Sequence, residues 1–193
     1  LDFGVFRDPN APVPPNVVLL KRITAINGVP VPFDGPQSQE ETDVEGLFPA
    51  NFLAGTVDGG ETRPGDEIEY TIYFVSNGDR PAENVAFCDL VPEFTDFNAT
   101  AFNTDPTTQD PGGIPGADRG IVLGFGSDEL SMTNVADSDR GVYVQPGDPT
   151  GLDCGGPNAN GAVVVFIGDI PNANSNPDPN TSYGFVRFRA RVN

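Results

Sequence analysis

The chain of 193 residues contains no histidine and no tryptophan. Histidine is the commonest general base and a frequent metal ligand, so its absence excludes Ser-His-Asp sites, Cys-His sites and histidine-ligated zinc. The 28 acidic residues are spread over loop-like sequence, and no two of them stand out as the paired carboxylates of a glycosidase. We therefore expect a protein that is not an enzyme.

Basic residues are also scarce, with 10 lysines and arginines against the 28 acidic residues and a formal net charge of −18. Nucleic acids and anionic membrane surfaces both bind through basic residues, so we expect neither as a partner. A charge of this size keeps a secreted surface soluble by mutual repulsion.

Long apolar runs are missing as well. The longest, AVVVFI at residues 162–167, has the length of a β-strand, and no amphipathic helical pattern persists for three turns. The sequence shows no signal peptide and no transmembrane run, which is what a mature, processed secreted protein is expected to show.

Turn residues and short strands dominate what is present, with 23 glycines and 20 prolines. The clearest strand alternates apolar and polar residues over 67–74, and Asn77-Gly78 provides a turn before a second strand at 83–90. The pattern predicts an all-β, two-sheet sandwich. Further strands are expected at 17–26, 29–33, 94–102, 121–125, 130–134, 141–144, 162–167 and 183–192.

The two central strands and their turns share a residue pattern made by Pro64, Gly65, Asp66, Tyr70, Thr71, Ile72, Asn77, Gly78, Ala82, Asn84, Val85, Asp89 and Pro92. Together with their turns they resemble the "conserved repeat domain" (domain of unknown function eleven) of secreted bacterial and archaeal surface proteins, and the first and last strands are most similar to cyanobacterial versions. The resemblance implies an immunoglobulin-like fold, an extracellular location and no catalytic residues.

The chain divides into two parts. Residues 1–16 form an extended N-terminal segment with a proline-rich spacer, and residues 17–193 form the sandwich module. An acidic, irregular insertion at about 34–63 interrupts the module. We expect the apolar residues of the insertion to pack down as a cover: Leu47, Phe48, Phe52 and Leu53.

Cys88 and Cys154 are the two cysteines. In the oxidising environment of a secreted protein we expect them to form a disulfide, and the alternative is two unpaired thiols.

Acidic and amide side chains gather in loops. Carboxylate oxygens in loops suit calcium, although no segment has the D-x-D-x-D-G spacing of a recognised calcium loop; the alternative is a solvated acidic surface. The candidate ligands are Asp105, Asp110, Asp137 and Asp139. No other cofactor is expected. Asn98 and Asn180 each begin a glycosylation sequon.

The last strand places Arg187, Arg189 and Arg191 on one face. One interpretation is cross-strand pairing with Glu67 and Glu69, where each exposed pair contributes at most about 1 kcal/mol. The other is a stripe that contacts an acidic face of another subunit.

Lys21 is the only lysine, and the alternation of the first strand leaves its direction open. In the inward register it requires a partner, because a buried charge is costly. Some immunoglobulin-like surface modules join such a lysine by an isopeptide bond to an Asn or Asp of a late strand. The alternative is an ordinary exposed or paired lysine.

Leu1, Phe3 and Val5 alternate with polar or small residues ahead of the spacer. This is the pattern of a strand that adds to the sheet of another subunit. A head-to-tail contact of this kind makes a filament. We therefore expect a homopolymeric structural subunit of an extracellular filament or cell-surface layer. The alternative is a monomeric adhesion or carbohydrate-binding module, although the chain lacks tryptophan for a sugar platform.

Overall fold

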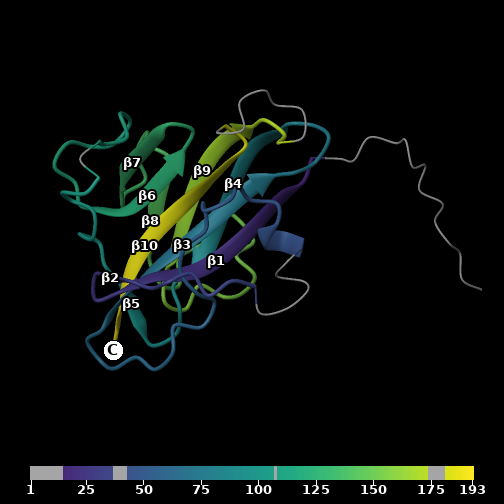
Figure 1. Cartoon of the computed structure of the whole chain (residues 1–193). Helices are drawn as coiled ribbons and strands as arrows, with labels where there is room; N and C mark the ends of the chain where they lie inside the picture. Colours follow the sequence, from purple (N-terminus) through teal and green to yellow (C-terminus); the bar gives the residue numbers. More distant parts are fainter. Residues whose placement is uncertain (1–14, 37–42, 107, 174–180) are drawn as a thin grey trace, which may run out of the picture.

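A computed structural model describes residues 15–36, 43–106, 108–173 and 181–193. Two antiparallel sheets pack face to face (Figure 1), which confirms the predicted all-β sandwich. The immunoglobulin-like character of the fold stays a prediction.

The two sheets differ in width. The larger has seven strands in the order β2 (Val29–Pro30), β1 (Val17–Ile26), β3 (Glu67–Ser76), β10 (Tyr183–Val192), β6 (Arg119–Phe125) and β7 (Asp128–Thr133), with β5 (Thr95–Phe97) paired to β10. The smaller has three strands in the order β4 (Ala82–Leu90), β9 (Ala162–Ile170) and β8 (Gly141–Val144).

Strands β1, β8 and β10 begin and end at the predicted residues, but two predicted strands are much shorter. The strand expected over 94–102 is reduced to β5, because the Asn98 side chain accepts hydrogen bonds from the amide and hydroxyl of Thr100 and turns the chain. The strand expected over 29–33 is reduced to β2, where Pro30 and Pro32 provide no amide for a ladder.

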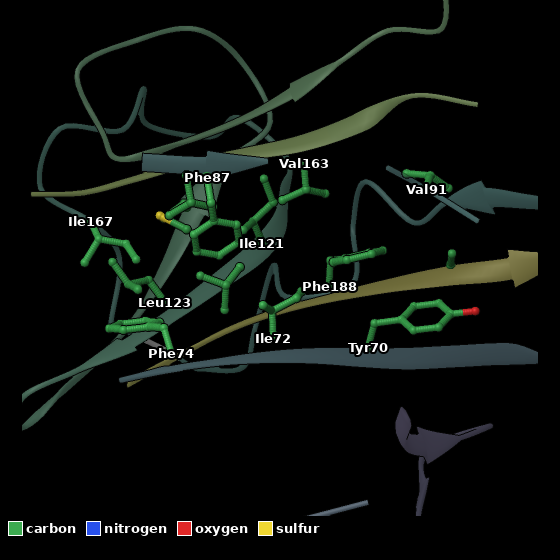
Figure 2. Close-up of a cluster of buried hydrophobic side chains, with 14 of the residues drawn as sticks. Tyr70, Ile72, Phe74, Phe87, Val91, Ile121, Leu123, Val163, Ile167 and Phe188 are labelled. Carbon is green, nitrogen blue, oxygen red and sulfur yellow. The ribbon is translucent and has the colours of Figure 1, made fainter. Parts of the chain in front are cut away.

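The main core lies between the two sheets, and Figure 2 shows its side chains meeting from both layers. Alternate residues of each strand point inward, as the period of two requires. Fully buried members, with less than 2 % of their surface exposed, include Phe74, Ile121, Leu123, Val163, Ile170 and Phe188.

The outer face of β3 is buried too, although the alternation of apolar and polar residues over 67–74 is typical of a strand with one buried face. Tyr73 and Val75 on this face form a second apolar cluster with Phe48, while Phe52 and Leu53 pack against it. Phe52 meets Tyr183 edge-on with ring centroids 4.6 Å apart. The insertion is therefore the predicted cover, except that Leu47 remains 37 % exposed.

Arg22 of β1 ties the insertion to the sheet. Its buried guanidinium donates to the Asp34 carboxylate at 2.7 Å, to the Gly55 carbonyl at 2.8 Å and to Glu45. A buried charge is tolerated only when it is paired and hydrogen-bonded, so these contacts fix the cover in one position.

Cys88 of β4 forms the predicted disulfide with Cys154, which lies between β8 and β9. The two Cα atoms are 5.3 Å apart and the residues are 66 positions apart in sequence. A crosslink that closes a loop of this length stabilises the fold by about 4 kcal/mol in the chain-entropy account.

Replacing both cysteines by alanine should lower the free energy of unfolding by about 2–5 kcal/mol, because the unfolded chain regains loop entropy. Urea denaturation of the purified variant measures this. Intact mass after alkylation without reductant provides the control, since a wild-type chain that takes up two alkyl groups has no disulfide.

Replacing Arg22 by alanine should destabilise the protein by about 3–5 kcal/mol, because Glu45 is left as a buried, unpaired charge. The exposed Arg80→Ala provides a matched control that should change stability by less than about 0.5 kcal/mol. Equal effects of the two substitutions on urea denaturation would refute the assigned role of Arg22.

Candidate functional site

The two lateral edges of the sandwich are built differently. At the edge formed by β7 and β8, main-chain groups are paired. Ser131 of β7 exchanges hydrogen bonds with Thr108 and Asp110, each at 2.9 Å, and the Tyr143 amide of β8 donates to the Asn134 carbonyl at 3.1 Å. This edge is closed by the chain itself.

The opposite edge is formed by β1 and β4, and we call residues 17–21 and 86–90 the open edge. The Ile23 amide donates to Thr56 and the Ile23 carbonyl accepts from it, at 2.8 and 3.0 Å, so Ile23 points its main-chain groups away from β3. The main-chain amide and carbonyl groups of successive residues alternate in direction along an antiparallel strand. Those of Val17, Leu19 and Lys21 therefore point to the same side as those of Ile23. Within the described ranges, no main-chain partner is found for these three residues.

The same alternation applies to β4. The Val91 amide donates to the Gly161 carbonyl at 2.9 Å, and the register is regular from Ala86 to Leu90. Odd-numbered residues of this stretch therefore bond to β9, while Ala86, Cys88 and Leu90 point their main-chain groups to the open side. The described part of the chain supplies no main-chain partner for them there.

The side chains on the inner face of β1 are incompletely covered. Leu19 lies opposite Phe74 in the ladder. Phe74 is fully buried, whereas Leu19 is 45 % exposed. The three-stranded sheet ends at β4, and the inner face of β1 in the wider sheet stays partly exposed at Leu19.

Lys21 and Asp89 join the two strands across the open edge. The Lys21 ammonium lies 2.5 Å from a carboxylate oxygen of Asp89 and 4.8 Å from the centre of the Tyr70 ring. Lys21 thus faces the space between the sheets and is a paired lysine. Strand β10 contains no Asn or Asp for an isopeptide bond, and its Phe188 ring lies 5.4 Å from the ammonium.

Burial raises the pKa of the Asp89 carboxyl, an effect that the nearby Lys21 charge only partly offsets. A carboxyl with a raised folded-state pKa stabilises the fold below its unfolded pKa, and that contribution is lost as the pH rises through the folded pKa.

We compare the free energies of unfolding of the wild type and of Asp89→Asn. The wild type should lose stability relative to the variant as the pH is raised from below the ordinary carboxyl pKa of 3.8, because Asp89 ionises in a buried position. The asparagine does not ionise, so the variant does not lose stability at this position. Urea denaturation of both proteins at a series of pH values measures the difference, and a pH-independent difference would contradict the assignment.

The three arginines of β10 lie on the outer face, and two of them are engaged within the chain. Arg189 binds Glu69 at 2.9 Å, and Arg187 lies 3.4 Å from Glu69 and 3.5 Å from Glu129. Cross-strand pairing thus accounts for both. Arg191 is exposed opposite Glu67, and the subunit-contact stripe stays a prediction.

Three of the four proposed calcium ligands come from segments that pack together. Asp110 binds Arg140 at 2.8 Å, Asp137 accepts from the Ile114 amide, and Asp139 accepts from the amides of Thr133 and Gly141. Their oxygens thus already accept internal hydrogen bonds, and Asp105 is exposed elsewhere. Among the described residues no group of three or more His, Cys, Asp or Glu could hold a metal ion.

Asn98 donates its side-chain amide to Glu67 at 2.5 Å, so a glycan at this nitrogen would replace that bond. Asn180 lies outside the described residues, as do Leu1, Phe3 and Val5.

A surface pocket of about 460 Å³ lies between the insertion and the turn after β2. Its walls are mostly apolar and include Phe33, Phe48 and Leu53, with Glu45 as the charged member. Such a pocket would suit the alternative of a monomeric adhesion or carbohydrate-binding module.

Comparison of the chain with protein-family models, curated proteins and solved structures finds no match. The resemblance to the conserved repeat domain therefore stays a prediction. No helix in the described ranges is long and apolar enough to cross a membrane.

Proposed function

We propose that the chain is a structural subunit of an extracellular filament or cell-surface layer, in which the N-terminal segment of one subunit adds as a strand to the next. The observation that carries the proposal is the open edge, where β1 and β4 both present main-chain groups for which the described residues supply no partner. Unpaired strand edges bind other strands readily, so natural proteins normally cover or distort them.

The protection of β4 is confined to its beginning. Asn84 has a φ of 53°, and the pairing with β9 shifts register on both sides of Val85. Such bulges deter pairing with another chain. The stretch from Ala86 to Leu90 has none, and remains suited to strand addition.

The N-terminal sequence suits the complementary role. Leu1, Phe3 and Val5 have the spacing of side chains on one face of a strand. The spacer from Asp8 to Asn16 reaches about 28 Å at polyproline pitch, which is enough to leave its own module. A contact between one end of a subunit and the edge of the next does not close on itself, so it produces a filament.

An extracellular location fits the disulfide and the surface charge. Disulfides persist in oxidising compartments, and a net charge of −18 keeps free subunits apart until a specific contact forms. The alternative of a monomeric adhesion or carbohydrate-binding module is favoured only by the apolar pocket beside Phe33.

Deleting residues 1–6 should abolish filaments, because the deletion removes the added strand and leaves residues 17–193 unchanged. Negative-stain electron microscopy and light scattering measure assembly. A matched pair of variants provides the control. Replacing Leu1, Phe3 and Val5 together by serine should prevent assembly, whereas Asp2→Ser combined with Phe6→Ser should leave assembly intact. Filaments from the deletion variant, or a full-length protein that stays monomeric under all conditions, would refute the proposal.

A further inference from the structure

We infer that the acceptor of the N-terminal segment is the open edge, where residues 1–6 of a second copy become a fourth strand of the smaller sheet, next to β4. This inference rests on the proposed function, since it names the partner surface of the same assembly.

Backbone geometry supports this position. Ala86, Cys88 and Leu90 direct amide and carbonyl groups outward, and the free stretch of five residues matches a six-residue donor in length. A strand added here would continue the ladder of β4 without displacing β9, because the bonds to β9 come from the alternate residues.

Side-chain burial gives a second, independent reason. A fourth strand in the smaller sheet would lie beside β4 and over the part of β1 that is exposed at Leu19. Side chains on the inner face of the donor would meet Leu19, which is 45 % exposed, and the half-buried Val17. The donor presents Leu1, Phe3 and Val5 for that face, so apolar surface meets apolar surface.

The Lys21–Asp89 pair marks one end of the apolar surface that the donor would cover. Pro15, before β1, lies beside Ala82 at the start of β4, and Lys21, further along β1, pairs with Asp89 near the end of β4. The two strands therefore run in the same direction. The Lys21–Asp89 pair therefore ends the apolar strip beyond Leu19.

A second copy is favoured over the chain's own N-terminus. To lie on its own edge, the segment would have to reverse direction immediately before β1. The intervening sequence carries prolines at 9, 12, 14 and 15, which restrict the backbone to extended conformations and oppose a tight reversal.

Cysteine trapping tests this arrangement. Phe3→Cys and Leu19→Cys proteins are prepared separately, mixed in denaturant without reductant so that the native disulfide persists, and refolded together. Air oxidation should yield a dimer that contains one chain of each kind, visible on a non-reducing gel and located by peptide mass spectrometry. Phe3→Cys mixed with Val29→Cys is the matched control and should give no such dimer, because Val29 is 67 % exposed but lies on β2, outside the open edge.

The outcomes separate the two claims. Filaments without a crosslink between positions 3 and 19 would overturn the acceptor assignment and leave the proposed function standing. In a chain that carries both Phe3→Cys and Leu19→Cys, a crosslink formed only within single chains would show that the segment covers its own edge, and would overturn both claims. Absence of filaments from the wild type would refute the proposed function itself.

A charge placed at the acceptor gives a second readout. Leu19→Asp should eliminate filaments, since the carboxylate would be buried against the donor, while Val29→Asp should leave assembly unchanged. Retention of the β-sheet circular dichroism spectrum in both variants verifies folding. Filaments of wild-type abundance from Leu19→Asp would overturn the inference.

Discussion

The difference in width between the two sheets determines which strand edges of this protein are closed and which are open. A three-stranded sheet stacks on a seven-stranded one, and the smaller sheet ends at β4 while the larger continues to β1 and β2. At the β7–β8 side the chain closes the gap with its own hydrogen bonds. At the β1–β4 side the described residues supply the Lys21–Asp89 pair and no main-chain bonds between residues 17–21 and 86–90, so Leu19 and these main-chain groups are available to another strand.

The apolar side chains on the outer face of the larger sheet are covered by the insertion. There the insertion covers Tyr73 and Val75 with Phe48, Phe52 and Leu53, and Arg22 holds it down through Asp34 and Glu45. The protein therefore has two apolar clusters on opposite faces of one sheet. The open edge, by contrast, has an apolar side chain, Leu19, that the described residues leave 45 % exposed beside main-chain groups without partners.

Much of the fold could be predicted from the sequence because its signals are local. Alternation and turn residues located β1, β8 and β10, and the even number of cysteines indicated the disulfide. The Lys21–Asp89 pair and the exposure of Leu19 could not be predicted, because they depend on which strand of one sheet lies above which strand of the other. The two registers of β1 are nearly equally apolar, so only the packing of the sheets shows that Lys21 faces inward.

Strand addition at the open edge requires the main-chain groups of Ala86, Cys88 and Leu90 in β4 to be unpaired in the free subunit and paired in the assembly. Residue-resolved hydrogen–deuterium exchange of assembled protein and of the variant lacking residues 1–6 tests it most directly. The amides of Ala86, Cys88 and Leu90 should exchange rapidly in the truncated monomer and become protected in filaments. The amides of Phe87 and Asp89, which bond to β9, should be protected in both. Equally rapid exchange of the three even-numbered amides in filaments would contradict it.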